Sequence, residues 1–163
     1  MVFVTVGSQK FQFDRLIKAV DDLVASGAAE GGAFAQTGAC TYVPEHMEHE
    51  AFLDREGFRA RMDACDVVVT HGGTGAIIGA VKDGKKVIAV PRRAEFGEHV
   101  DDHQAEIVGQ FGEMGLIEPC MDPVDLPEAY VRALSKTYLP YKSNTARFCA
   151  DLSEYIDKVG GAR

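Results

Sequence analysis

The sequence lacks several features that would assign it to a specialised class of protein. It has no tryptophan and only four cysteines, which are Cys40, Cys65, Cys120 and Cys149, and no two of them form a Cys-x-x-Cys pair. Neither a zinc cluster of that kind nor a dense disulfide framework is expected, and a reducing cytoplasm fits this composition. No apolar run approaches the roughly 20 residues of a membrane-spanning helix. The opening MVFVTVG lacks the basic flank of a signal peptide, so we expect any membrane contact to be peripheral or through a partner.

Positive charge is also scarce. The chain has 17 Lys and Arg against 25 Asp and Glu, a net charge of −8, and no block of basic residues. This argues against nucleic acid as the main partner, because neutralising phosphates needs clustered cations. A small anionic ligand remains compatible with the charge, since one local site can oppose it. With 163 residues, 46% of them hydrophobic, we expect a single globular domain over residues 1–163.

Apolar strand-like runs alternate with segments of helical spacing. The runs occupy residues 2–6, 33–38, 66–70, 86–91 and 116–119; the helical patterns occupy 11–26, 58–65, 74–83, 100–115, 123–136 and 144–161, and residues 41–54 are ambiguous. This alternation predicts an α/β fold with a Rossmann-like, doubly wound parallel sheet. Asp125 is the expected N-cap of its helix. The last helix carries Phe148, Leu152, Tyr155 and Ile156 on one stripe, and we expect it to pack on its own domain rather than on a partner.

Ligands of such sheets bind at the carboxyl ends of the strands, which here selects residues 7–10, 38–44, 71–75 and 91–99. The strongest candidate is THGGTG, residues 70–75. Gly72, Gly73 and Gly75 allow close approach of the backbone, Thr74 offers a hydroxyl, and the helix that follows offers N–H groups at its positive end. These features suit a phosphate or diphosphate, which His71 could also bind. The alternative is a tight turn packed on the sheet, with His71 only capping the strand.

The loop PRRAEFGEHVDDHQ, residues 91–104, is the second candidate. Paired arginines suit phosphates, whereas carboxylates and amides suit ligands rich in hydroxyl groups. The residues expected to form the wall of a sugar or nucleotide site are Arg92, Arg93, Glu98, His99, Asp102 and Gln104. An ordinary charged surface loop is the alternative.

Several better-known site motifs are absent. The first strand is not followed by G-x-G-x-x-G, and GAVKDGKK fails as a Walker motif because Lys86 stands where Ser or Thr is needed. There is no G-x-S-x-G, and no catalytic residue can be assigned. The pairs His46/His49 and His99/His103 have workable metal-ligand spacing, but neither forms His-Glu-x-x-His. We expect no metal site, with a metal-binding protein kept as an alternative.

The blocks THGGTGAIIGAV, VIAVPRR and GEHVDDHQAEI resemble the C-terminal, donor-binding half of family 28-type glycosyltransferases. With the opening VFVTVGSQKFQFDRLI, the chain resembles the small subunit of split glycosyltransferases, which include a eukaryotic dolichol-linked N-acetylglucosaminyltransferase subunit and bacterial exopolysaccharide and capsule subunits. The resemblance implies the C-terminal half of a GT-B fold. It also implies inverting transfer from a UDP-sugar to a lipid-diphosphate acceptor, without a cofactor or an obligatory metal.

The resemblance further implies a membrane-anchored second subunit that supplies the acceptor site and the catalytic base. This chain would then be cytoplasmic, held at the inner face of the plasma membrane through that partner. His71, Gly72, Gly73 and Thr74 match the family's diphosphate-binding turn, and Gly7 and Ser8 would lie in the cleft between subunits.

The match to the family is incomplete at two positions. Of the family's Asp/Gln pair on sugar hydroxyls only Gln104 carries over cleanly, because His103 precedes it. Gly79 stands where many relatives bind ribose with a glutamate, so ribose recognition would need another group. Two alternatives therefore stay open: a non-catalytic scaffold subunit, or a self-sufficient small Rossmann-like enzyme acting on nucleotide sugars.

Overall fold

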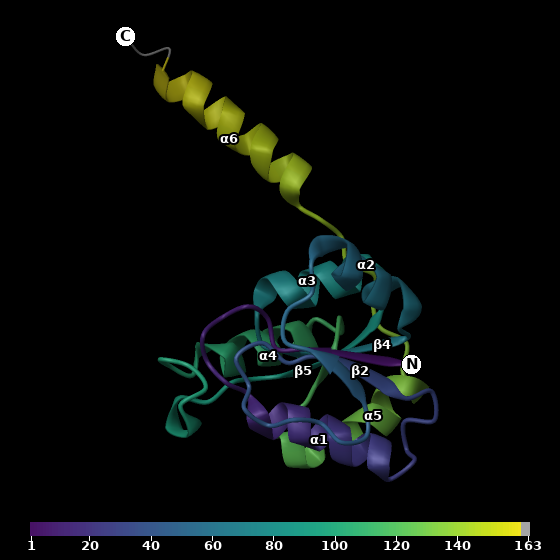
Figure 1. The fold of residues 1–163 in the computed structure, drawn as a ribbon. Coiled ribbons are helices and arrows are strands. Elements are labelled where there is room, and N and C mark those ends of the chain that lie inside the picture. Colours follow the sequence, from purple (N-terminus) through teal and green to yellow (C-terminus); the bar gives the residue numbers. More distant parts are fainter. Residues whose placement is uncertain (161–163) are drawn as a thin grey trace.

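The computed structural model describes residues 1–160, which form a six-stranded, wholly parallel sheet and the helices around it (Figure 1). The strands are β1 (Val2–Thr5), β2 (Ala33–Gln36), β3 (Glu48–Glu50), β4 (Val67–His71), β5 (Lys86–Val90) and β6 (Glu118–Pro119). The helices are α1 (Asp14–Ala25), α2 (Arg55–Ala64), α3 (Thr74–Lys82), α4 (His103–Glu113), α5 (Leu126–Ser135) and α6 (Thr145–Gly160), with 3-10 turns η1 (Ala94–Phe96) and η2 (Pro123–Asp125).

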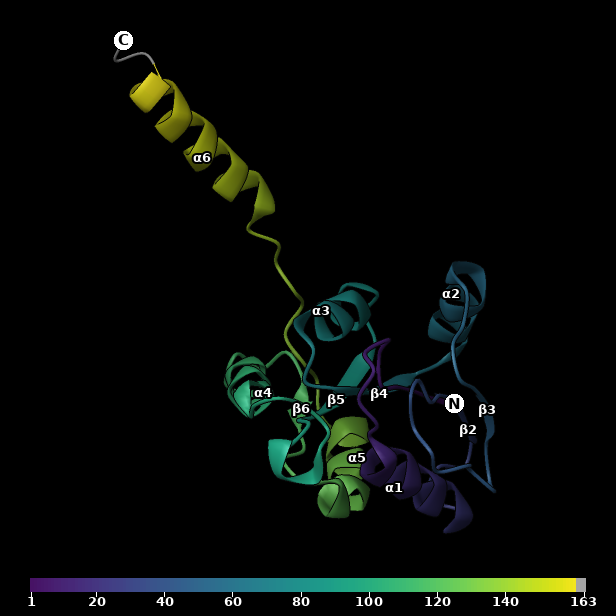
Figure 2. The same ribbon diagram turned by 60° about the vertical axis from the view of Figure 1, so that its left-hand side comes forward.

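Both faces of the sheet are buried, and the alternation of side chains along each strand divides the core in two. In β1, Val2 and Val4 point to the face covered by α1 and α5, where they pack with Leu16 and Leu126. Phe3 points to the opposite face, which α2, α3 and α4 cover. Figure 2 shows the two layers of helices on either side of the sheet.

The strand order β3-β2-β1-β4-β5-β6 reverses direction between β1 and β4. These two strands pair in parallel, with Thr5 opposite Thr70, so their carboxyl ends lie side by side. The loops that leave them, at Gly7 and at His71, therefore begin next to each other. This is the switch point at which doubly wound sheets bind ligands.

The predicted α/β class and the doubly wound parallel sheet are confirmed. The ambiguous region 41–54 contains the edge strand β3, whose residues are all exposed. Asp125 occupies the N-cap position of α5, as predicted, but its side chain makes no capping hydrogen bond. Asp122 instead accepts a hydrogen bond from the Val124 N–H at the start of η2. Helix α4 begins at His103, three residues later than expected.

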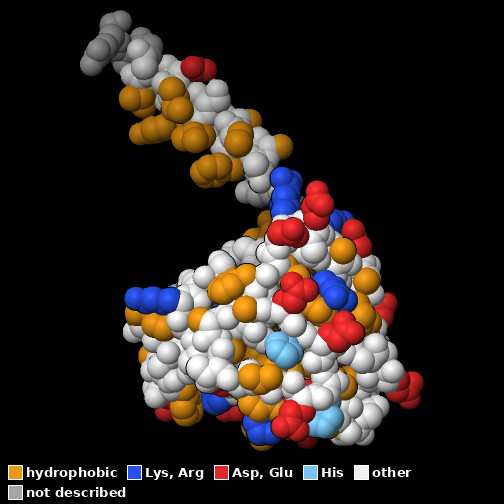
Figure 3. Space-filling view, viewed as in Figure 1, with side chains coloured by type: hydrophobic (Ala, Val, Ile, Leu, Met, Phe, Trp, Pro, Cys, Tyr) orange, Lys and Arg blue, Asp and Glu red, His pale blue; other side chains and the backbone are white. Residues whose placement is uncertain are grey.

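The prediction that the last helix packs on its own domain is wrong. Helix α6 extends away from the sheet and its covering helices, and none of its residues is buried (Figures 1 and 3). Its apolar stripe is exposed throughout: Phe148, Leu152, Tyr155, Ile156 and Val159 are 62%, 45%, 64%, 58% and 57% accessible. Among residues 1–160, no helix has the length and apolarity needed to cross a membrane.

Candidate functional site

The turn between β4 and α3 presents the start of a helix at the carboxyl edge of the sheet. Gly73 precedes α3 and offers no side chain to cap it, and the first intrahelical bond is donated by the Ile77 N–H to the Gly73 carbonyl. The N–H groups of Thr74, Gly75 and Ala76 therefore have no acceptor within the helix. Thr74 and Gly75 are exposed. An anion at this point would meet the free N–H groups of Thr74 and Gly75. It would also meet the Thr74 hydroxyl and the positive end of the helix dipole.

Gly72 and Gly73 were expected to bring their backbone close to a bound phosphate, but the structure gives them another role. The Gly72 N–H donates to Gln104 Oε1 at 3.1 Å, and the Gly73 N–H donates to the His71 carbonyl at 2.8 Å, so both are already paired. A Cβ at Gly72 would lie 2.8 Å from Gln104 Cβ, and one at Gly73 only 2.3 Å from His71 Nε2. These two glycines make room for protein side chains. The N–H groups left for a ligand are those of Thr74 and Gly75.

His71 lies beneath this turn as a neutral imidazole. It is 9% exposed and packs so close to Gly7 that a Cβ there would lie 2.7 Å from His71 Cε1. Burial, with a smaller contribution from the positive charge of Arg92, lowers the pKa of His71 from 6.5 to about 4. Near neutral pH the ring can therefore take part in hydrogen bonds but brings no positive charge to a bound phosphate.

Gln104 fixes the two ligand-facing turns relative to each other. It is buried at the start of α4, and its Oε1 accepts hydrogen bonds from the N–H groups of both Gly72 and Arg92, at 3.1 and 3.2 Å. One amide oxygen thus joins the turn after β4 to the turn after β5. Gln104 acts here as a positioning residue, and contact of its amide nitrogen with a ligand remains a prediction.

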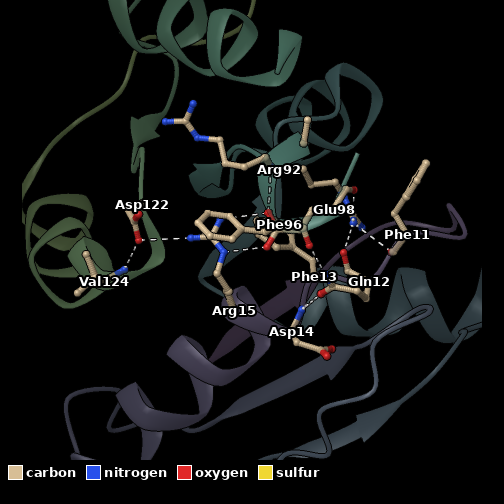
Figure 4. Close-up of polar contacts among 12 residues, drawn as sticks. Phe11, Gln12, Phe13, Asp14, Arg15, Arg92, Phe96, Glu98, Asp122 and Val124 are labelled. Atoms are coloured by element: carbon tan, nitrogen blue, oxygen red, sulfur yellow. Dashed lines mark hydrogen bonds and ion pairs between the residues drawn. The ribbon is translucent and has the colours of Figure 1, made fainter. Parts of the chain in front are cut away.

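Arg92 and Glu98, which we expected in the wall of the ligand site, are each 0% exposed and face the protein (Figure 4). The Arg92 guanidinium donates to the carbonyls of Val6, Phe11, Gln12 and Glu98 at 2.7 to 3.1 Å. The Glu98 carboxylate accepts two bonds from Arg15, at 2.8 and 3.1 Å, and one from the Arg93 N–H. Their expected role as ligand contacts is corrected, because these groups hold the loop after β1 against the loop after β5.

The network has members that the sequence pattern did not reveal. Arg15 pairs with Glu98 across 83 residues of chain, and its guanidinium also lies over the Phe96 ring, 4.1 Å from the centroid. Gln12 Nε2 donates to the Phe96 carbonyl at 3.0 Å. Arg15 lies on an otherwise ordinary amphipathic helix, so no local signal could have found it.

The remaining predicted site residues lie at the same edge of the sheet. Arg93 and His99 are partly exposed and Asp102 is exposed, with its Oδ1 accepting from the Ala94 N–H at 2.9 Å. Gly7, with φ of 75°, and the exposed Ser8 follow β1. Their roles toward a ligand or a partner remain predictions. His46 lies elsewhere, with its Nδ1 3.4 Å from Asp21.

A hollow of about 570 Å³ lies at the opposite edge, where the strands begin. Of its four lysines, Lys85 donates to the carbonyls of Asp63 and Cys65, Lys86 to that of Leu134, and Lys136 to Glu118 Oε2, while Lys82 lies over the Tyr141 ring. This hollow lies at the edge of the sheet opposite the switch point.

Comparison with protein families assigns this domain to a family. Residues 1–156 match the glycosyltransferase family 28 C-terminal domain. The chain belongs to this family. No curated protein matches it.

Solved structures agree with the family assignment at the level of the fold. A glycotransferase of kitacinnamycin is similar with a TM-score of 0.58 and 18% identity, over 83% of this chain and 35% of that one. MurG of Acinetobacter baumannii is similar with a TM-score of 0.53 and 16% identity, over 81% of this chain and 41% of that one. The predicted fold, the Rossmann-like C-terminal half of a GT-B glycosyltransferase, is confirmed, and the chain spans about two fifths of these longer proteins.

The buried guanidinium predicts a contrast between two adjacent arginines. Arg92→Met should lower the free energy of unfolding by about 3 kcal/mol, because four carbonyl oxygens lose their charged donor. Arg93→Met, whose side chain is partly exposed, should change it by less than about 0.5 kcal/mol. Urea unfolding followed by circular dichroism measures both. Equal losses in the two variants would contradict the structural role of Arg92.

The neutral His71 predicts a pH dependence of stability. Between pH 6.5 and about 4 the unfolded chain binds a proton that the folded chain excludes, so the free energy of unfolding should fall as the pH decreases through this range. The full effect of this one group is about 3 kcal/mol. His71→Asn should remove this part of the dependence of the unfolding free energy on pH. His103→Asn should keep it, because the ring that it removes is exposed. Urea unfolding at a series of pH values tests this, and an unchanged slope in His71→Asn would exclude His71 as the titrating group.

Proposed function

We propose that this chain is the donor-binding subunit of a two-component inverting glycosyltransferase. It would bind a UDP-sugar, and a membrane-anchored second subunit would bring a lipid-diphosphate acceptor to it at the inner face of the membrane, in the synthesis of a polysaccharide. The observation that carries the proposal is the open start of α3 at the switch point, within a domain of the glycosyltransferase 28 family.

The start of α3 suits the diphosphate of such a donor. The N–H groups of Thr74 and Gly75 and the Thr74 hydroxyl would bind its oxygens, with Gly72 and Gly73 holding His71 and Gln104 close beneath. Fixed donors of this kind stabilise negative charge as it develops. They would do so without an obligatory metal ion, although Arg93 at the same edge could add a positive charge.

In the proposed reaction the bond between the anomeric carbon and the diphosphate oxygen breaks, and its electron pair stays on UDP. An acceptor hydroxyl oxygen forms the new bond from the opposite face and gives its proton to a base. No side chain of this domain is assigned as that base, which we place in the second subunit. The donor sugar would lie between the α3 turn and residues 99–104, near Asp102 and Gln104.

One observation supports dependence on a second chain. Helix α6 carries an exposed apolar stripe that no part of residues 1–160 covers, as Figure 3 shows along its length. A helix with one apolar face normally buries it. We infer that the stripe contacts the second subunit.

UDP binding tests the donor site. Calorimetry should detect UDP binding to the chain, alone or with its partner, and Gly73→Ala should weaken it about tenfold, which is ~1.4 kcal/mol. The added methyl would meet His71 Nε2 at 2.3 Å and displace the ring and the turn. Gly109→Ala is the matched control, because it adds the same methyl within a helix, at a position in α4 where the methyl meets no atom within 4 Å.

Absence of UDP binding at millimolar concentration, with and without partner, would exclude the donor site. Binding without sugar transfer by the assembled pair would instead favour a scaffold subunit, an alternative consistent with Gly79 in place of the family's acid. Turnover of UDP-sugars by the isolated chain would favour a self-sufficient enzyme.

The α6 stripe predicts a selective loss of assembly. Leu152→Asp should reduce co-purification with a co-expressed second subunit, while the thermal midpoint of the isolated chain stays unchanged because α6 has no buried residue. Ala150→Asp places the same charge on the opposite side of the helix and should leave assembly intact. Equal assembly of both variants would exclude the stripe as the contact.

A further inference from the structure

Two histidines and an aspartate converge in the segment between η1 and α4. His99 Nδ1 lies 3.2 Å from Asp101 Oδ1, and His103 Nδ1 makes a short contact with the same oxygen. One ligand atom from each of the three residues falls within 4.8 Å of the others. Within residues 1–160 this is the one such group of three found, and His46 and His49 do not form another.

These distances are close to those of a metal centre. Zinc binds imidazole nitrogen and carboxylate oxygen at about 2.0–2.2 Å, so two ligand atoms of a tetrahedral site lie about 3.3 Å apart. The His99–Asp101 contact of 3.2 Å already has this length. The contact between His103 and Asp101 has to lengthen on metal binding, and both of these side chains are about half exposed.

Part of the cluster is held in place before any ion binds. The His99 side chain is only 9% exposed, and its ring lies against Phe11, with centroids 5.6 Å apart. The His103 ring meets the His99 ring edge to face at 4.9 Å. The backbone N–H of His103 also donates to Asp101 Oδ1 at 3.2 Å, which fixes the turn between these two residues. The largely enclosed His99 side chain thus forms a fixed point against which the other two ligands can close.

We propose that His99, Asp101 and His103 bind one late first-row transition-metal ion, of the Zn²⁺ type, with water in the remaining coordination position. Two imidazole nitrogens and one carboxylate oxygen suit Zn²⁺, Co²⁺ and Ni²⁺, whereas Mg²⁺ and Ca²⁺ prefer oxygen ligands. With three protein ligands, the fourth coordination position of the ion is left to a water molecule that can exchange. The ion is not needed for the proposed transfer, and this inference does not rest on that function.

The site borders the α3 turn. His103 directly precedes Gln104, whose Oε1 accepts a hydrogen bond from the Gly72 N–H in the turn between β4 and α3. A bound ion would fix the His99–His103 segment beside the proposed donor site.

Metal titration of the untagged, chelator-treated chain tests the site. In competition with a chromophoric chelator, Zn²⁺ should bind with a stoichiometry of one and micromolar or tighter affinity, and excess Mg²⁺ should not displace it. Co²⁺ should give the visible absorption of a low-coordinate site. His99→Ala, Asp101→Asn and His103→Ala should each weaken Zn²⁺ binding at least about tenfold.

Two control variants separate this site from other ligands of the chain. His49→Ala, on the exposed strand β3, and Cys149→Ser, on α6, should leave the affinity unchanged. Circular dichroism should show the same fold in all variants. Absence of micromolar binding, or binding that survives His103→Ala and is lost in His49→Ala or Cys149→Ser, would overturn the proposal.

Discussion

The hydrogen bonds of the Arg92 guanidinium hold together the loops at the carboxyl edge of the sheet, where the candidate ligand site lies. The side chain starts at the end of β5, runs beneath the switch point, and donates to the Val6 carbonyl at the end of β1, 86 residues earlier in the sequence. A charge in this position is costly to bury, and its four carbonyl contacts offset that cost only while both loops keep their places. Its Nε is buried without a hydrogen-bond partner, which adds to the cost of burying this side chain.

Arg92 also influences the turn between β4 and α3. Arg92 helps burial to keep His71 neutral, and its own backbone N–H shares Gln104 Oε1 with Gly72. The turn that presents α3 is therefore positioned by protein contacts on its inner side and open on its outer side. Such a division leaves the Thr74 and Gly75 N–H groups with the preorganised, unpaired character that binding a diphosphate requires.

The sequence predicted the sheet well and the roles of its loop residues poorly, for physical reasons. The β-branched runs of β1, β4 and β5 are buried on both faces, so their composition alone identifies them. Strand β3 consists of exposed polar residues joined to β2 by backbone pairing, which leaves no pattern. Arg92 and Glu98 were found as charged loop residues, but their partners lie far away in the sequence, and spacing does not reveal which way a side chain points.

An open ligand edge and an unpacked helix have a common explanation. Thr74, Gly75, Asp102 and Ser8 are exposed together at the switch point, and water there would weaken every hydrogen bond to a leaving diphosphate. Glycosyl transfer to an acceptor other than water needs this edge covered. Helix α6 cannot cover it, because it extends away from the sheet, yet its apolar stripe requires a surface of its own. One additional body that binds α6 and closes over the switch point would satisfy both needs, which is why the proposed function includes a second subunit.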